Sequence, residues 1–183
     1  MPRGTAGKEA HVVLGWKVPL AALLLCLSAC DRAGQNEGLI PPSQRPVTTS
    51  VAYVDSAGAA HTLAEHLGKI VVVDVWATWC PPCQRSLPSI ADLQSRDGND
   101  YVVLAISVDK GGWDDVRPYL GANPQLGLRA ALPKDGDALH PFGSIHGIPT
   151  TLIVDRQGRL RERWSGYYPG RAEKVLHEAL SEP

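Results

Sequence analysis

Two cysteines, Cys80 and Cys83, lie where an apolar run over 71–76 gives way to a segment that begins at Pro81. The run predicts a buried strand, and the segment after it predicts a helix. A cysteine at a helix start meets unpaired backbone N–H groups and the positive end of the helix dipole, which favour the charged sulfur. The second cysteine lies one turn further on, close enough to close a disulfide. The pattern therefore predicts a thiol–disulfide exchange site.

The same pair could instead form half of a zinc site, which usually needs a second pair of cysteines or histidines at matching spacing. The later histidines, His140 and His146, are not spaced as a ligand pair, and prolines fill both positions between the cysteines. We therefore expect neither a metal nor an organic cofactor at this site.

Residues 1–29 have the pattern of a secretory signal. Basic residues, Arg3 and Lys17 among them, precede an apolar core over 18–27 that is too short to span a bilayer. The stretch 27–30 resembles the bacterial lipoprotein box, and in such proteins Cys30 would receive a diacylglyceryl thioether and become the new amino terminus. We expect lipidation at Cys30. An ordinary cleaved signal and an uncleaved short anchor are the alternatives.

Several acyl chains on Cys30 would hold the protein at the membrane stably, because each buried methylene adds about 0.8 kcal/mol. Asp31 follows, and in enteric bacteria lipoproteins with aspartate at that place tend to stay in the inner membrane. We therefore expect an extracytoplasmic protein, anchored on the periplasmic side of the inner membrane. Residues 30–49 are rich in Gly, Pro, Gln, Asn and Ser, and we expect a flexible linker there.

The 183 residues are enough for one domain of ordinary size plus tails, and we place that domain at 50–183. A formal net charge of −1 and the lack of a long basic run give no reason to expect nucleic acid as a partner. A hydrophobic content of 44% fits a globular core rather than a disordered chain.

Within that domain the apolar patterning predicts alternating strands and helices. The continuous valines of 69–76 indicate a strand buried on both faces. Other strands are expected at 50–54, 101–108, 151–154 and 159–165, the last two joined by a hairpin turn. Helices are expected at 81–96, with a kink at Pro88, at 112–120 and at 171–181. A short helical turn is expected at 62–67 and another short helix at 139–146. This order predicts an α/β fold, with a central mixed β-sheet flanked by helices.

The segment 73–83, which ends in the two cysteines, resembles the active-site motif of the thioredoxin superfamily. The later segment Gly147-Ile148-Pro149-Thr150-Thr151 resembles that superfamily's cis-proline loop. The two motifs lie further apart than in plain thioredoxin, which suits the extracytoplasmic TlpA/ResA-like (DsbE/CcmG-like) branch. The resemblance covers 51–180, and it implies a thioredoxin-like fold with an N-terminal extension.

Carried over by position, the resemblance makes Cys80 the attacking thiolate. Cys83 becomes the resolving thiol, which releases the reduced client from a mixed disulfide. Pro149 would follow a cis peptide bond and set its loop beside Cys80. The Ile148 backbone would pair with an extended client as a short added strand. Trp79 is expected to be a partly exposed lid over the thiols.

Asp74 lies on the predicted strand six residues before Cys80. In thioredoxin an acid at that place is buried below the cysteines and helps to deprotonate the resolving thiol, and burial raises a carboxyl pKa toward neutral pH. The alternative is a solvated strand acid. The strand over 101–108 contains no lysine, the residue that partners this acid in thioredoxin, so the proton relay implied by the resemblance is incomplete.

Three further tryptophans, Trp76, Trp113 and Trp164, are expected in the core or at its edge. His140 and His146 are expected at the surface or in loops, and the sequence assigns them no chemistry.

The resemblance implies a membrane-tethered enzyme that reduces disulfides in client proteins, with apocytochrome c as one candidate client. A membrane electron donor of the CcdA/DsbD type would keep it reduced. Three alternatives stay open. The same site could run as a disulfide oxidase or isomerase, because direction depends on reduction potential. Soft thiolates also suit Cu(I), which leaves a copper-binding chaperone, although the sole methionine, Met1, would be lost with the signal. The third is a non-catalytic adhesion or scaffold domain.

Overall fold

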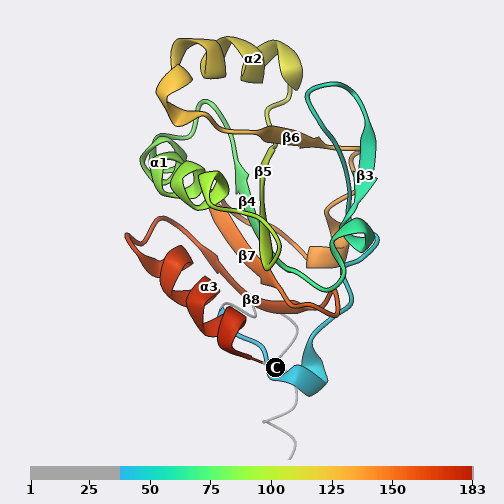
Figure 1. Ribbon diagram of the computed structural model, residues 1–183. Coiled ribbons are helices and arrows are strands. Elements are labelled where there is room, and N and C mark those ends of the chain that lie inside the picture. Colours follow the sequence, from blue (N-terminus) through green and yellow to red (C-terminus); the bar gives the residue numbers. More distant parts are fainter. Residues whose placement is uncertain (1–37, 183) are drawn as a thin grey trace, which may run out of the picture. The chain divides into compact units, whose positions relative to one another are not determined.

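The computed structural model of the chain describes residues 38–182 (Figure 1). The predicted signal peptide and Cys30 lie outside these residues. None of the described helices is long and apolar enough to span a bilayer.

Within residues 38–182, eight strands form one mixed sheet in the order β1-β8-β7-β4-β5-β6-β2-β3. β4 runs parallel to β5, and β5 runs parallel to β6, whereas the other pairings are antiparallel. The strands are β1 (Gly38–Leu39), β2 (Ala52–Val54), β3 (Ala60–Thr62), β4 (Ile70–Trp76), β5 (Tyr101–Ser107), β6 (Ala130–Pro133), β7 (Thr150–Val154) and β8 (Leu160–Ser165). The predicted mixed sheet is confirmed.

Helices α1 (Pro81–Ser95) and α3 (Arg171–Ser181) lie on the same side of this sheet (Figure 1). With α2 (Trp113–Ala122), they supply apolar side chains to one core cluster that also contains Val72 of β4. The opposite face is covered by side chains from irregular segments, such as Ile40, Leu63 and Phe142. Because both faces are covered, all seven residues of β4 are buried, as its continuous valines predict.

Helix α1 begins immediately after Cys80, which caps it. The Cys83 backbone N–H donates a hydrogen bond to the Cys80 sulfur at 3.2 Å. Pro81 takes the first helical position, where its missing N–H would have had no intrahelical partner in any case. Pro88 lies inside the helix, which continues to Ser95. The local sequence thus determines both where the strand ends and where the helix starts.

Three short strands, β1, β3 and β6, form where the sequence predicts none. They have two, three and four residues, too few for an alternating pattern to be recognised. The short helix predicted over 139–146 is confirmed only in part. A 3₁₀ turn, His140–Phe142, forms there, and it ends at Gly143, which adopts φ 79°, outside the helical range.

The flexible linker predicted over 30–49 is also wrong for residues 38–49, the part of it that the structure describes. β1 pairs with β8, and Val47 forms an isolated bridge with Arg159. Ile40 is only 3% exposed because it packs into the core on the face of the sheet opposite α1 and α3. This segment is therefore an integral part of the domain.

Arg45 links this segment to the turn after β7 through a buried ion pair and to Glu182, near the end of α3, through a partly buried one. Arg45 contacts Asp155 at 3.1 Å and Glu182 at 3.2 Å, and Arg161 contacts Glu182 at 2.8 Å. The hydrogen bonds from Arg161 hold the pKa of Glu182 below its ordinary value, and Arg45 adds to the effect. Arg45 and Asp155 are both buried, so loss of one would leave the other charged and without its partner.

We expect Arg45→Ala to destabilise the domain by about 3–5 kcal/mol, because it leaves the Asp155 carboxylate buried without its cation. Urea unfolding at neutral pH measures the change. Lys174→Ala is the control: it removes a cation from the exposed pair with Glu178 on α3 and should leave the midpoint unchanged. Equal midpoints for Arg45→Ala and the wild type would show that this ion pair does not fasten residues 38–49.

Candidate active site

The two cysteines form a disulfide at the junction of β4 and α1. Their Cα atoms are 5.2 Å apart, Cys83 is fully buried, and Cys80 is 3% exposed. The Cys83 N–H that caps the helix also points at the Cys80 sulfur, so in the reduced state it would favour a thiolate there. Both cysteines thus lie at a helix start, where the sequence places them, and at disulfide distance from each other.

The loop before β7 lies against this disulfide. The Ile148–Pro149 peptide bond is cis, as the resemblance implies, and the Ile148 carbonyl oxygen lies 3.6 Å from Cys80 Sγ. The Thr150 hydroxyl donates to the Gly147 carbonyl at 2.6 Å and stabilises the turn. Residues far apart in the sequence are thus brought to the same sulfur atom.

Asp74 is fully buried on β4, which excludes the solvated alternative. The Thr151 hydroxyl donates to Asp74 Oδ1 at 3.0 Å, and Oδ2 has no hydrogen-bond partner among the described residues. Burial raises the pKa of Asp74 to about 7, and the hydrogen bond from Thr151 opposes the rise. Asp74 can therefore exchange a proton near neutral pH.

The hydrogen-bond partner of Asp74 comes from β7, a predicted strand, but the sequence does not indicate this contact. Ala105 lies opposite Asp74 on β5, in agreement with the missing lysine, whereas Thr151 lies opposite it on β7. The only signal for Thr151 in the sequence is a polar residue at the start of an otherwise apolar strand. That signal does not reveal which neighbouring strand the hydroxyl faces.

The tryptophans divide as the sequence predicts. Trp79 is 65% exposed beside the disulfide, whereas Trp76 is fully buried against Tyr119, with the ring centroids 5.6 Å apart. Trp164 is buried too, and the Arg171 guanidinium lies 4.6 Å from the centre of its ring. Among the tryptophans that the structure describes, Trp79 is the one that presents an exposed aromatic surface next to the cysteines.

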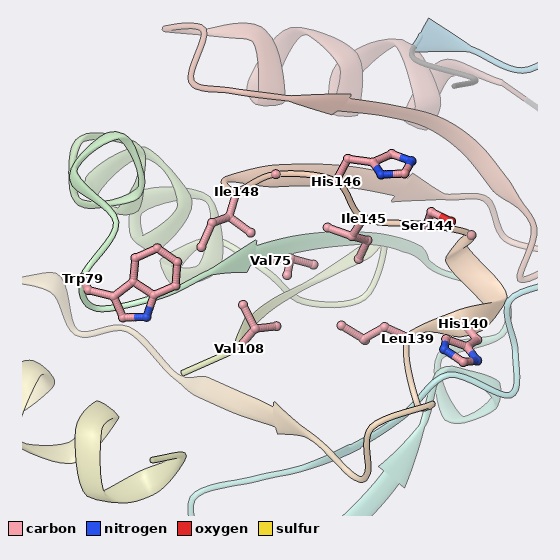
Figure 2. Close-up of a pocket in the computed structure, with 11 residues that line it drawn as sticks. Val75, Trp79, Val108, Leu139, His140, Ser144, Ile145, His146 and Ile148 are labelled. Atoms are coloured by element: carbon pink, nitrogen blue, oxygen red, sulfur yellow. The ribbon is translucent and has the colours of Figure 1, made fainter. Parts of the chain in front are cut away.

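An open cavity of about 750 Å³ extends from Trp79 along the cis-proline loop (Figure 2). Its apolar side chains include Val75, Ile145 and Ile148, and they point into a common space in Figure 2. His140 and His146, to which the sequence assigns no chemistry, also line it; the rest of the lining is Val108, Leu139, Gly143, Ser144 and Gly147. We call this cavity the client groove.

Two buried charged side chains hold the loops on either side of the disulfide. Asp109 accepts hydrogen bonds from the Thr78 N–H at 2.9 Å and from the Thr78 hydroxyl at 2.7 Å, just before Cys80. Arg163 donates to the Phe142 carbonyl at 2.9 Å and to the carbonyl of Ser144, which lines the client groove, at 2.6 Å. Sequence reasoning missed both residues, because each lies far along the chain from the loop that it holds.

Comparison with known proteins identifies the family. The model of the AhpC/TSA family matches residues 46–163, more than half of the chain. The chain belongs to the AhpC/TSA family. Its thioredoxin-like fold agrees with this assignment and confirms the fold that the two motifs imply.

Individual members of the family are only distantly similar in sequence. Thiol-disulfide oxidoreductase ResA of Geobacillus thermodenitrificans is 24% identical over 115 residues, which cover 61% of this chain and 63% of ResA. A protein of Haemophilus influenzae without an assigned function is 28% identical over 121 residues, which cover 64% of this chain and 77% of the relative. The chain thus spans slightly less than two thirds of the length of ResA.

Two solved structures share the fold. The pneumococcal exposed lipoprotein thioredoxin from Streptococcus pneumoniae superposes with a TM-score of 0.60 at 26% identity, covering 69% of this chain and 97% of that one. A thiol:disulfide interchange protein of the thioredoxin family from Chlorobium tepidum superposes with a TM-score of 0.63 at 22% identity. The superposition covers 75% of this chain and 98% of that one.

The raised pKa of Asp74 predicts a pH-dependent stability. Asp74 has a pKa of about 7 in the folded protein against an ordinary 3.8, so between these values the folded state binds a proton that the unfolded state does not. The free energy of unfolding should therefore fall as the pH rises from about 4 to 7. Asp74→Asn should remove this pH-dependent part of the stability. The variant's stability relative to the wild type should increase across this window by roughly 3–5 kcal/mol.

Urea unfolding at several pH values measures the difference. Asp114→Asn, at an exposed position on α2, is the control and should run parallel to the wild type. A stability difference between Asp74→Asn and the wild type that stays constant with pH would contradict the burial argument.

Proposed function

We propose that this chain is an extracytoplasmic thiol–disulfide oxidoreductase that reduces disulfides in client proteins through Cys80 and Cys83. One observation carries the proposal: the two sulfurs form a disulfide in the first turn of α1, beside the Ile148 carbonyl. The activity named for the ResA relative supports it.

The reaction consists of two exchanges. The Cys80 thiolate attacks a client disulfide, a bond forms between Cys80 and one client sulfur, and the other client sulfur leaves as a thiolate. Cys83 then attacks Cys80 Sγ, which closes the Cys80–Cys83 disulfide and releases the second client thiolate. The client gains two electrons and the protein loses them, so an external donor must reduce the pair again.

The residues around the sulfurs have distinct roles in these steps. The Cys83 N–H stabilises the Cys80 thiolate, because it already points at that sulfur. Asp74 accepts the proton of Cys83 before the second attack, since its raised pKa lets it act as a base near neutral pH. The Ile148 backbone and the Trp79 ring bind an extended client segment over Pro149, and the client groove accepts its side chains.

The N-terminal region supports a membrane tether. Cys30 lies outside the described residues, in a stretch that resembles the lipoprotein box, and a relative of the same fold is named as an exposed lipoprotein. With lipid on Cys30, the domain would work at the membrane surface, close to a membrane electron donor of the CcdA/DsbD type. Residues 38–49 are packed on the domain, so only the stretch before them could act as a spacer.

The reduction potential of the Cys80–Cys83 pair decides whether the protein reduces or oxidises its clients. A reductase requires a potential near that of thioredoxin, about −270 mV, whereas a strong oxidase lies near −120 mV. We favour the reductase direction, with apocytochrome c as the candidate client. A measured potential near the upper value would reassign the same site to oxidation or isomerisation.

We expect Cys80→Ser to lower disulfide reductase turnover at least about 100-fold, because no other thiol occupies the start of α1.

In the Cys83→Ala variant, Cys80 should still attack clients but should hold them as mixed disulfides, because the resolving thiol is missing. Non-reducing electrophoresis and mass spectrometry of cell extracts identify the trapped proteins. Cys30→Ser is the matched control and should leave exchange chemistry intact.

The identity of the trapped proteins tests the client separately from the activity. Captured proteins that carry CxxCH motifs would support cytochrome c maturation. If turnover is present but no such protein accumulates, the apocytochrome client is wrong while the oxidoreductase activity stands.

We expect Cys30→Ser to move the protein from the membrane fraction to the soluble fraction and to abolish labelling with radioactive palmitate. Cys26→Ser, inside the apolar core of the signal, is the control and should keep both properties. A wild-type protein that takes up no palmitate would refute the lipid tether.

A further inference from the structure

Asp74 needs a route by which it can pass on a proton. It is fully buried, and so is Cys83. Oδ1 accepts the hydrogen bond from Thr151, whereas Oδ2 finds no partner within residues 38–182. A base that takes a proton from Cys83 must lose it again before the next cycle. The disulfide and its neighbours leave no opening to solvent at Asp74 itself.

A second cavity reaches the hydrogen-bond partner of this acid. It has a volume of about 340 Å³ and opens between α1 and the segment that joins β8 to α3, two regions that lie on the same side of the sheet (Figure 1). Thr151 lines it, together with Ser86 and Ser89 of α1, Trp164 of β8 and Ala172 of α3. The volume suffices for several waters of about 30 Å³ each, and the hydroxyls offer them hydrogen-bond partners.

We propose that this cavity is the proton entrance of Asp74 and that the Thr151 hydroxyl relays the proton between them. The inference rests on the function proposed above, because it concerns the proton that Asp74 takes from Cys83. Thr151 acts through Asp74, so it is a positioning residue for the reaction.

The relay closes the proton balance of the resolving step. Cys83 gives its proton to Asp74, and the resulting thiolate attacks Cys80 Sγ. The Cys80–Cys83 bond forms while the bond from Cys80 to the client sulfur breaks, and the client sulfur leaves as a thiolate. The neutral Asp74 then donates to Thr151 Oγ, while the Thr151 O–H donates to water in the cavity. Asp74 returns to its charged form, and the proton reaches solvent.

A hydroxyl suits this position because it both donates and accepts hydrogen bonds, whereas a lysine ammonium only donates. The 3.0 Å contact with Asp74 therefore works in both protonation states of the acid. Thr151 is 5% exposed, so its hydroxyl contacts the acid without opening Asp74 to bulk solvent. The threonine on β7 thus provides a proton path on the opposite side of β4 from β5, the strand that lacks the lysine.

The surroundings of Asp74 contain few groups that would compete. Its pKa responds to burial and to the Thr151 hydrogen bond. Cys80, which caps α1, and Cys83 of α1 belong to the core cluster on the same face of the sheet as Asp74, and β5 presents no ionisable side chain next to Ala105. Ionisable and charged groups gather instead around the mouth of the cavity and on the adjoining end of α3: Asp92, Arg96, Glu162, Tyr167, Tyr168, Arg171 and Glu173.

A single-turnover experiment tests the relay in the full chain, with Cys26→Ser and Cys30→Ser so that only the active-site pair reacts. Reduced protein is mixed with Ellman's reagent, an aromatic disulfide that releases one coloured thiolate in each attack. The first release reports on Cys80 and the second on Cys83. Thr151→Val should slow the second release about tenfold or more and leave the first unchanged.

Two further readouts separate a relay from a structural role. The pH midpoint of the second release should move upward in Thr151→Val, because the hydrogen bond that opposes the raised pKa of Asp74 is gone. Thr151→Ser, which keeps the hydroxyl, should restore both the rate and the midpoint.

The cavity is tested without touching Asp74. Ser89→Trp fills the cavity from a half-exposed position on α1 and should slow the second release, whereas Ser95→Trp, exposed on the same helix outside the cavity, should not. The proposal is overturned if Thr151→Val leaves the second release unchanged, or if Ser89→Trp and Ser95→Trp behave alike. A wild-type protein without a first release would instead refute the proposed oxidoreductase function. If Thr151→Val does not fold, the two tryptophan variants decide the question.

Discussion

The burial of β4 on both faces is the constraint on which the rest of the site depends. A strand of seven buried residues needs apolar cover from α1 and α3 on one face and from residues such as Ile40 and Leu63 on the other. This packing fixes the carboxyl end of the strand, and so it places Cys80 at the start of α1. It also keeps water from Asp74, whose pKa rises to about 7 in consequence. The position of Cys80 and the raised pKa of Asp74 therefore follow from the same packing.

The loops that meet the disulfide owe their positions to buried charges. A buried charged side chain must be hydrogen-bonded, and when its partners are groups of a loop, that loop is held in place. Asp109 holds Thr78 just before Cys80, and Arg163 holds the carbonyls of Phe142 and of Ser144, a residue that lines the client groove. The sulfur and the surface that would receive the client are thus held by separate polar anchors, one at the end of β5 and one on β8.

The features that the sequence predicts are those with a local signal. The valine run, the paired cysteines and Pro81 occur within one short segment. That segment alone predicts the burial of β4 and the start of α1, without knowledge of contacts from distant parts of the chain. The motif around Pro149 is equally local. By contrast, Arg45 belongs to a Gly- and Pro-rich stretch that looks like a linker, and its partner Asp155 lies 110 positions away. Pairings of that kind become visible only when the fold brings the elements together, and the contact of Thr151 with Asp74 is of the same kind.

The alternation of side chains along β4 separates two tasks that would otherwise interfere. Successive residues of a strand point to opposite faces, so Asp74 faces the side covered by α1, whereas Val75 lines the client groove on the other side. Thr151 pairs with Asp74 on the α1 side, where it lines the second cavity. A client seated in the groove would cover the exposed Trp79 and the sulfur of Cys80 without covering the mouth of that cavity. In the mechanism that we propose, the proton of Cys83 would then leave while the client is bound, which is when the resolving step requires it.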